Sequence, residues 1–169
     1  IKSMTTFQIM NTSYQIKNWS AFRKFAPDAE GTIEFGESRF QFHHARAFED
    51  TYREIFEQGI YQFNQTSDKP YIIDCGANMG LSVLYFAKKY PNASIIAFEP
   101  EEHIYNVLQK NVNQYALSNV SIEKKAVWDE QTTLKFFTDN GMGGSVTNAL
   151  DRKSTRLNSS HEWISRMPS

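Results

Sequence analysis

Two acidic residues with a Gly-rich segment between them are the part of this 169-residue sequence best suited to chemistry. Asp74 closes a short apolar run and opens the segment DCGANMG, and Glu99 closes a second apolar run 25 residues later. Nucleotide-binding folds place a Gly-rich turn after one strand and a ribose-binding acid at the end of the next. The two acids and the loop together therefore predict a site for an adenosine-containing cofactor, whereas the loop alone would also suit a tight turn without a ligand.

The residue types within the loop suit a tight turn that a ligand or another part of the chain can approach closely. Gly76 lets the chain turn sharply, and Gly80 permits close approach of the backbone to a ligand or of the helix to the sheet. Asn78 is one of the few residue types besides glycine that adopt a positive φ. Together with Ala77, these residues predict a loop that presents free backbone N–H groups to a carboxylate or phosphate at the helix N-terminus.

The order of acid and glycine discriminates between candidate cofactors. Dinucleotide sites use a GxGxxG loop that faces a pyrophosphate, but here Asp74 precedes the turn, where it would repel a pyrophosphate and attract an ammonium group. S-adenosylmethionine carries both an amino acid end and a ribose, so it suits Asp74 and Glu99 together. A NAD-dependent oxidoreductase on a similar sheet and a catalytically silent Rossmann-like interaction module remain as alternatives.

Alternating strands and helices are predicted to position these residues. Strands are expected at 71–74, 94–98, 120–127 and 133–138, and helices at 81–90 and from Pro100 onward. Glu101 and Glu102 are expected in the first turn of the later helix, where negative charge complements the helix dipole. Parallel strands joined by helices are the expected arrangement.

The residues before this unit predict a helix, a hairpin and a second helix. The apolar residues that carry these three predictions are, in order, Ile16, Trp19, Phe22 and Phe25, then Ile33, Phe35, Phe40 and Phe42, and then Phe48, Tyr52, Ile55 and Phe56. Their spacing is helical in the first and third groups and alternating in the second. Pro27 and Gly59 are expected to follow the ends of the two helices.

The core of the sequence resembles a known enzyme family. The run from Tyr71 to Val112 is similar to the FkbM-type methyltransferases. The matching features are DCGANMG, the strand end AFEP, the helix residue Asn111, and the later AVWD followed by another strand. These belong to the class I enzymes that depend on S-adenosylmethionine. The resemblance covers roughly residues 71–146, and more loosely 33–63.

The resemblance implies an α/β fold with a Rossmann-like class I methyltransferase sheet, preceded by a helix and hairpin extension. It implies cofactor contacts from Asp74, Gly76, Ala77, Asn78, Gly80, Glu99, Pro100, Ala126 and Val127. It also implies a hydroxyl of a sugar, glycan or secondary metabolite as the methyl acceptor. It assigns no metal and no catalytic base, and His43, His44 and His103 are weak candidates for such a base.

The ends of the sequence predict a fragment that lacks the C-terminal half of the sheet. The chain begins with Ile1, and residues 151–169 show no periodicity and resemble joining sequence or a polar disordered terminus. The predicted organisation is an extension over 1–69, a partial cofactor-binding core over 70–148 and a tail over 149–169. Residues 139–148 are expected to form a flexible loop, and the strand at 71–74 an exposed apolar edge that leaves the fragment marginally stable and inactive.

Composition narrows the choice of partners. A net charge of −1 gives no reason to expect nucleic-acid binding. No apolar run approaches the roughly 20 residues of a membrane-spanning helix. The single cysteine, Cys75, rules out an internal disulfide framework and suits a reducing, cytoplasmic location; its place at the end of a predicted buried strand favours a packing role.

Overall fold

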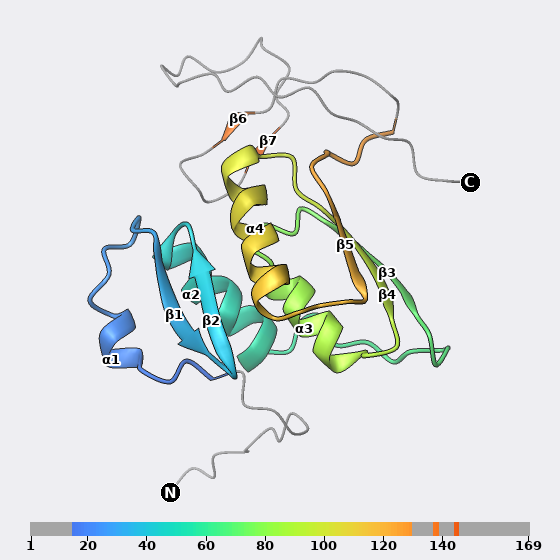
Figure 1. Ribbon diagram of the computed structural model, residues 1–169, viewed down its shortest axis with the longest axis horizontal. Coiled ribbons are helices and arrows are strands. Elements are labelled where there is room, and N and C mark those ends of the chain that lie inside the picture. Colours follow the sequence, from blue (N-terminus) through green and yellow to red (C-terminus); the bar gives the residue numbers. More distant parts are fainter. Residues whose placement is uncertain (1–14, 130–136, 139–143, 146–169) are drawn as a thin grey trace, which may run out of the picture.

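A computed structural model of the chain describes residues 15–129, 137–138 and 144–145 (Figure 1). The N-terminal elements are α1 (Trp19–Phe22), β1 (Gly31–Phe35), β2 (Ser38–Phe42), α2 (Ala45–Tyr52) and the π-helix η1 (Arg53–Glu57). They are followed by β3 (Tyr71–Cys75), α3 (Leu81–Lys89), β4 (Ser94–Phe98), α4 (Glu102–Gln114) and β5 (Val120–Glu123), and then by the short strands β6 (Phe137–Thr138) and β7 (Gly144–Ser145).

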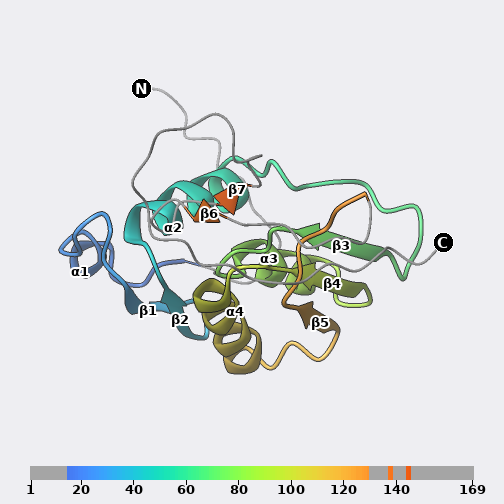
Figure 2. The same cartoon turned by 90° about the horizontal axis from the view of Figure 1, so that it is seen from above.

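Strands β3, β4 and β5 form a parallel sheet in that order, and α3 and α4 connect them. Both helices lie on the same face of the sheet (Figures 1 and 2). Helix α3 is almost wholly buried, as its nearly continuous apolar sequence predicts. The predicted α/β class with a Rossmann-like arrangement of parallel strands is confirmed.

The hairpin of β1 and β2 packs on the far side of these helices from the sheet (Figure 1). Ile33 pairs with Phe40 across the hairpin, and the alternating apolar side chains all point inward, as predicted. Phe48 of α2 contacts Phe35 edge to face, with ring centroids 6.0 Å apart. The hairpin, the helices and the parallel sheet contribute to one buried apolar cluster.

Helix α1 is shorter than the apolar spacing predicts. Ile16 lies outside it and forms an antiparallel bridge with Phe35 of the hairpin. The helix begins after Asn18, whose side chain accepts a hydrogen bond from the Ala21 N–H at 2.9 Å. The inclusion of Ile16 in the helix was therefore wrong, because an apolar residue at helical spacing is buried equally well by a strand contact.

The second predicted helix extends over α2 and η1 as one continuous helical segment. Its last turn widens so that the Gln58 N–H donates to the Arg53 carbonyl, a π-type hydrogen bond of 2.9 Å. Gly59 follows with φ +69°, as the sequence predicts for a residue that ends a helix.

Strand β3 is only partly buried, contrary to the prediction of a buried strand. Ile72 points toward the helices, whereas Tyr71 and Ile73 are 64% and 40% exposed. Within the described residues, β3 is an edge strand, and the sheet face that carries Ile73 has no covering layer. The expected exposed apolar edge at 71–74 is therefore present.

The C-terminal elements differ from the prediction in length and pairing. Strand β5 ends at Glu123, short of the predicted Val127. Of the strand predicted at 133–138, only β6 is described, and it pairs antiparallel with β7 inside the segment expected to be a loop. Residues 130–136, 139–143 and 146–169, which include the predicted tail, lie outside the described residues.

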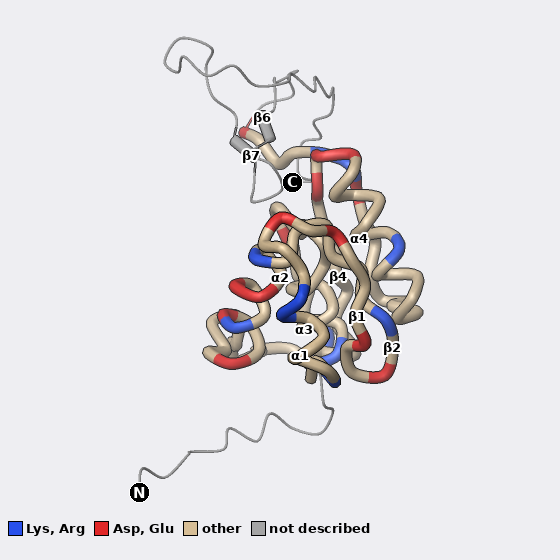
Figure 3. The backbone as a smooth tube through the Cα atoms, turned by 90° about the vertical axis from the view of Figure 1, so that its left-hand side faces the viewer, with Lys and Arg blue, Asp and Glu red and all other residues tan. Residues whose placement is uncertain are grey.

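No helix in residues 15–129 is both long and apolar enough to cross a membrane. Lys and Arg are distributed along the described chain among Asp and Glu rather than gathered in one segment (Figure 3).

Candidate functional site

The structure brings Asp74 and Glu99 to the same edge of the parallel sheet. Asp74 pairs in register with Ala97 of β4, so Glu99 follows the end of the neighbouring strand. This is the carboxyl edge, where open α/β sheets bind their ligands. The two acids lie on either side of the loop that joins β3 to α3, as the sequence predicts.

The loop adopts the left-handed backbone conformations expected from its sequence. Gly76 and Gly80 have φ values of +90° and +95°, and Asn78 between them has φ +50°. A β-carbon on Gly76 would meet no other heavy atom within 4 Å, so space beside this residue is open among the described atoms. A ligand can therefore approach the backbone closely at Gly76.

The predicted free N–H groups of the loop are not found. Gly76 and Ala77 both donate to the Phe98 carbonyl at 2.9 Å. The Asn78 N–H donates to Glu99 Oε2 at 3.0 Å, and the Met79 N–H donates to Asn78 Oδ1 at 2.7 Å. The Gly80 N–H donates to the Ala77 carbonyl. The expectation of free donors was wrong, because these N–H groups form hydrogen bonds to Phe98 and Glu99 beside the loop or to acceptors within it.

Glu99 is the most strongly perturbed acid of this edge. It is 6% exposed, and its two carboxylate oxygens accept one N–H each, from Asn78 and from Glu101, at 3.0 Å. Burial raises the pKa of Glu99 to about 7; the two hydrogen bonds oppose this effect, and the charges of Glu101 and Asp74 add to it. Because a carboxylate has about four lone-pair positions, two remain for ligand hydroxyls.

Asp74 holds the first turn of α3. Its Oδ2 accepts a hydrogen bond from the Ser82 hydroxyl at 2.6 Å. Burial raises the pKa of Asp74, and the Ser82 hydrogen bond partly opposes this. The sequence suggested that Asp74 would attract an ammonium group, but it did not identify Ser82 as a partner. A hydroxyl residue in the first turn of the helix was the available signal.

The remaining predicted cofactor residues lie beyond the ends of β4 and β5. Pro100 is half-buried and leads into α4, which begins at Glu102, because the Glu101 side chain caps the helix by accepting from the Ile104 N–H. Ala126 and Val127 are half-buried and follow β5. The parallel order of the strands puts these segments at the same edge as Asp74.

Gly80 is required by the packing of the loop on α4. A β-carbon there would lie 2.7 Å from Leu108 Cδ1. The sequence predicted close approach to a ligand or of the helix to the sheet, whereas the close contact observed at Gly80 is with helix α4.

Replacing Gly80 with alanine is expected to lower the free energy of unfolding by about 2–4 kcal/mol, from backbone strain and overpacking together. Gly59→Ala is the matched control, because Gly59 also has a positive φ but its β-carbon would meet nothing closer than 4.0 Å. The control should lose about 1 kcal/mol. Equal losses in urea titrations of the two variants would contradict the packing role of Gly80.

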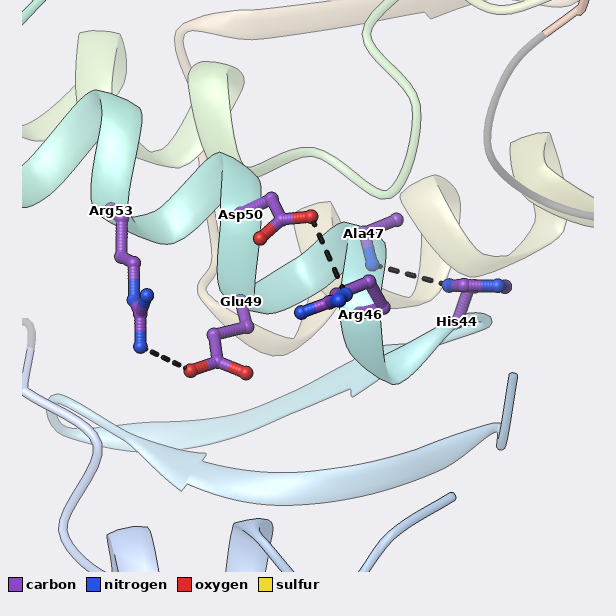
Figure 4. Close-up of polar contacts among 6 residues, drawn as sticks. All are labelled: His44, Arg46, Ala47, Glu49, Asp50 and Arg53. Carbon is purple, nitrogen blue, oxygen red and sulfur yellow. Dashed lines mark hydrogen bonds and ion pairs between the residues drawn. The ribbon is translucent and has the colours of Figure 1, made fainter. Parts of the chain in front are cut away.

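The three histidines differ in their surroundings. His44 caps α2, where its Nδ1 accepts from the Ala47 N–H at 3.1 Å (Figure 4). His43 is buried, with its ring centroid 6.4 Å from that of His103. His103 Nε2 lies 2.8 Å from Glu30 Oε1. His44 therefore has a structural role, and the geometry identifies none of the three as a base.

His44→Ala is expected to destabilise the protein by about 1 kcal/mol more than His44→Asn, because asparagine can replace the capping acceptor and alanine cannot. Thermal or urea unfolding of the two variants measures this difference. Equal stabilities would show that the cap contributes nothing.

Cys75 is exposed, which corrects the predicted packing role. Side chains alternate along β3, so Cys75 shares the uncovered side of the sheet with Tyr71 and Ile73. Burial of the sulfur and the nearby charge of Asp74 raise the pKa of the thiol, which disfavours the reactive thiolate.

Two curated proteins that this chain resembles are methyltransferases. It is 46% identical over 61 residues to Methyltransferase sdnD of Sordaria araneosa and 29% identical over 108 residues to Methyltransferase 1 of Beauveria bassiana. These matches cover 36% and 64% of this chain, but only 24% and 43% of the two relatives. The chain thus spans less than half the length of either relative. No family model matches it.

One solved structure that matches part of this chain is the methyltransferase FkbM from Methylobacillus flagellatus KT. The alignment has a TM-score of 0.35 and 19% sequence identity, and it covers 48% of this chain and 21% of that one. The methyltransferase resemblance drawn from DCGANMG and AFEP agrees with the curated relatives.

Proposed function

We propose that this chain carries the cofactor-binding part of an S-adenosylmethionine-dependent methyltransferase of the FkbM type. The observation that supports this most is the placement of Asp74 and Glu99 at the ends of adjacent parallel strands, on either side of a left-handed loop. We propose residues 70–148 as the partial core and residues 1–69 as its N-terminal extension, with 149–169 outside both.

The proposed cofactor follows from the charge and the hydrogen bonds of the loop. The buried Glu99 and the half-buried Asp74 favour a ligand with a cationic end and ribose hydroxyls over one with a pyrophosphate. The five N–H groups of residues 76–80 already have acceptors within the protein, so phosphate oxygens would have to displace these hydrogen bonds to bind there. Both features support S-adenosylmethionine over a nicotinamide dinucleotide.

We assign the residues to parts of the cofactor as the resemblance to the FkbM-type methyltransferases implies. Asp74, Gly76, Ala77, Asn78 and Gly80 would surround the methionine end, with Gly76 offering the open approach. Glu99 would accept hydrogen bonds from the ribose hydroxyls beside Pro100. The backbone at Ala126 and Val127 would flank the adenine.

The proposed reaction is methylation of a hydroxyl on a sugar, glycan or secondary metabolite. The acceptor oxygen attacks the methyl carbon, the carbon–sulfur bond breaks with its electron pair on sulfur, and the acceptor proton leaves to a base. The described residues would contribute by holding the cofactor in line with the acceptor, since positioning lowers the barrier to such a displacement.

Transfer of a labelled methyl group tests this function. The protein expressed from its complete natural gene is incubated with methyl-tritiated S-adenosylmethionine and a panel of sugars and hydroxylated metabolites, with the matching amines as controls. Label on a hydroxyl acceptor is the expected result. Label on amines alone would overturn the O-methylation proposal, and cofactor binding without transfer to any acceptor would favour the silent-module alternative.

A further inference from the structure

Asn111 is a buried polar residue on the apolar side of α4. It is 4% exposed, and the other buried residues of this helix are the apolar Ile104, Val107 and Leu108. An uncompensated amide in such a place is costly, so its hydrogen bonds must explain its presence.

The Asn111 side chain bonds to two segments that are distant in sequence. Its Oδ1 accepts from the Gln41 N–H, and its Nδ2 donates to the Gln41 carbonyl, both at 2.8 Å. The same Nδ2 donates to the Met79 carbonyl in the glycine loop, also at 2.8 Å. Both amide hydrogens and the oxygen are thus used, and one side chain joins strand β2 to the loop between Asp74 and Gly80.

The loop needs support of this kind. Gly76 and Gly80 leave the backbone conformationally free, and Asn78 between them has a positive φ that a residue other than glycine keeps only where the surroundings enforce it. Helix α4 contacts two consecutive loop residues, because Asn111 holds the Met79 carbonyl and Leu108 packs on Gly80. On the opposite side, Glu99 holds the Asn78 N–H.

We propose that Asn111 is a positioning residue that couples the N-terminal hairpin to the conformation of the loop, and thereby sets the affinity for the cofactor. The effect on affinity rests on the function proposed above, whereas the effect on the loop does not. The hairpin would then contribute to the affinity of the site for the cofactor.

Asn111→Asp is the sharpest test, with Tyr115→Phe as the control. The aspartate keeps an acceptor for the Gln41 N–H but places an oxygen against two carbonyl oxygens. Tyr115 also ties α4 to the hairpin, since its hydroxyl donates to the Phe35 carbonyl at 2.7 Å. Its replacement by phenylalanine tests this tie and leaves the Asn111 amide unchanged. Asn111→Ala serves if the buried charge prevents folding.

Hydrogen exchange of the loop amides, measured without ligand on the protein from the complete natural gene, reports the positioning directly. Exchange of residues 76–80 is expected to accelerate at least tenfold in the Asn111 variant, with smaller changes in β4, and to stay unchanged in Tyr115→Phe. For Asn111→Asp, protection should partly return at pH 5, where a protonated carboxyl can donate one hydrogen bond again. Unchanged loop exchange, or equal acceleration in Tyr115→Phe, would overturn the proposal.

Calorimetric titration with S-adenosylhomocysteine measures the consequence for binding. The Asn111 variant is expected to bind at least tenfold more weakly than wild type, and Tyr115→Phe within twofold of it. If the Asn111 variant bound S-adenosylhomocysteine as tightly as wild type while its loop amides exchanged faster, the proposed link between loop conformation and cofactor affinity would be overturned. Failure of the wild type to bind would instead overturn the proposed function, while the exchange result would still decide the role of Asn111 in the loop.

Discussion

Glu99→Gln is expected to weaken the binding of S-adenosylhomocysteine by about 100-fold at pH 8. Each hydrogen bond from a ribose hydroxyl to a carboxylate contributes roughly 1.5 kcal/mol or more, and each 1.4 kcal/mol changes the dissociation constant tenfold. The substitution also replaces one of the two oxygens that hold the Asn78 and Glu101 N–H groups. Calorimetric titration of the purified variant measures the loss.

Glu102→Gln is the matched control for this experiment. Like Glu99→Gln, it removes one negative charge. Glu102 lies at the start of α4, where it makes an exposed ion pair with Lys124 at 3.3 Å. Exposed pairs contribute little to stability, so this variant should bind the ligand nearly as wild type does. Wild-type affinity in Glu99→Gln would contradict the ribose assignment, provided that both variants unfold cooperatively.

The stability of the ligand-free protein should fall as pH rises from about 4.5 to about 7, in part because of Glu99. Its pKa is near 4.5 when unfolded and about 7 when folded, so in this window the folded state binds more protons than the unfolded state. A shift of this size corresponds to a loss of about 3 kcal/mol once pH exceeds 7. The raised pKa of Asp74 acts in the same direction.

Urea titrations at pH 5 and pH 8 measure this dependence. Glu99→Gln cannot ionise at this position, so its stability should fall by about 3 kcal/mol less than that of wild type between the two pH values. Identical changes in both proteins would show that Glu99 is already ionised in the folded state at pH 5.

The elements that were predicted correctly are those whose local sequence pattern is compatible with only one type of secondary structure. Alternation from Ile33 to Phe42 predicted the hairpin, and the apolar run after Leu81 predicted a buried helix between parallel strands. The burial of β3 could not be predicted in the same way, because the exposure of Ile73 depends on what covers the sheet. Ile16 was misplaced because helical spacing did not reveal its bridge to Phe35.

The positions of the two acidic residues and the backbone conformation of the loop could be predicted from the sequence, but the hydrogen bonds of the loop could not. Asp74, Glu99 and the positive φ of Asn78 followed from residue type and position. The pairing of the loop N–H groups with Phe98 and Glu99 depends on how closely β4 passes the loop, which no local pattern specifies. Asn111 stood out in the sequence only through the family resemblance, because its partners lie 32 and 70 residues away.

Calorimetric titration of the protein from the complete natural gene with S-adenosylhomocysteine and, separately, with NAD⁺ tests the central claim most directly. A buried Glu99 and a half-buried Asp74, beside a loop whose N–H groups are already bonded, should favour the sulfur-containing nucleoside. We predict saturable one-to-one binding of S-adenosylhomocysteine and at least 100-fold weaker binding of NAD⁺. Tighter binding of NAD⁺, or no binding of S-adenosylhomocysteine, would contradict the assignment of this site.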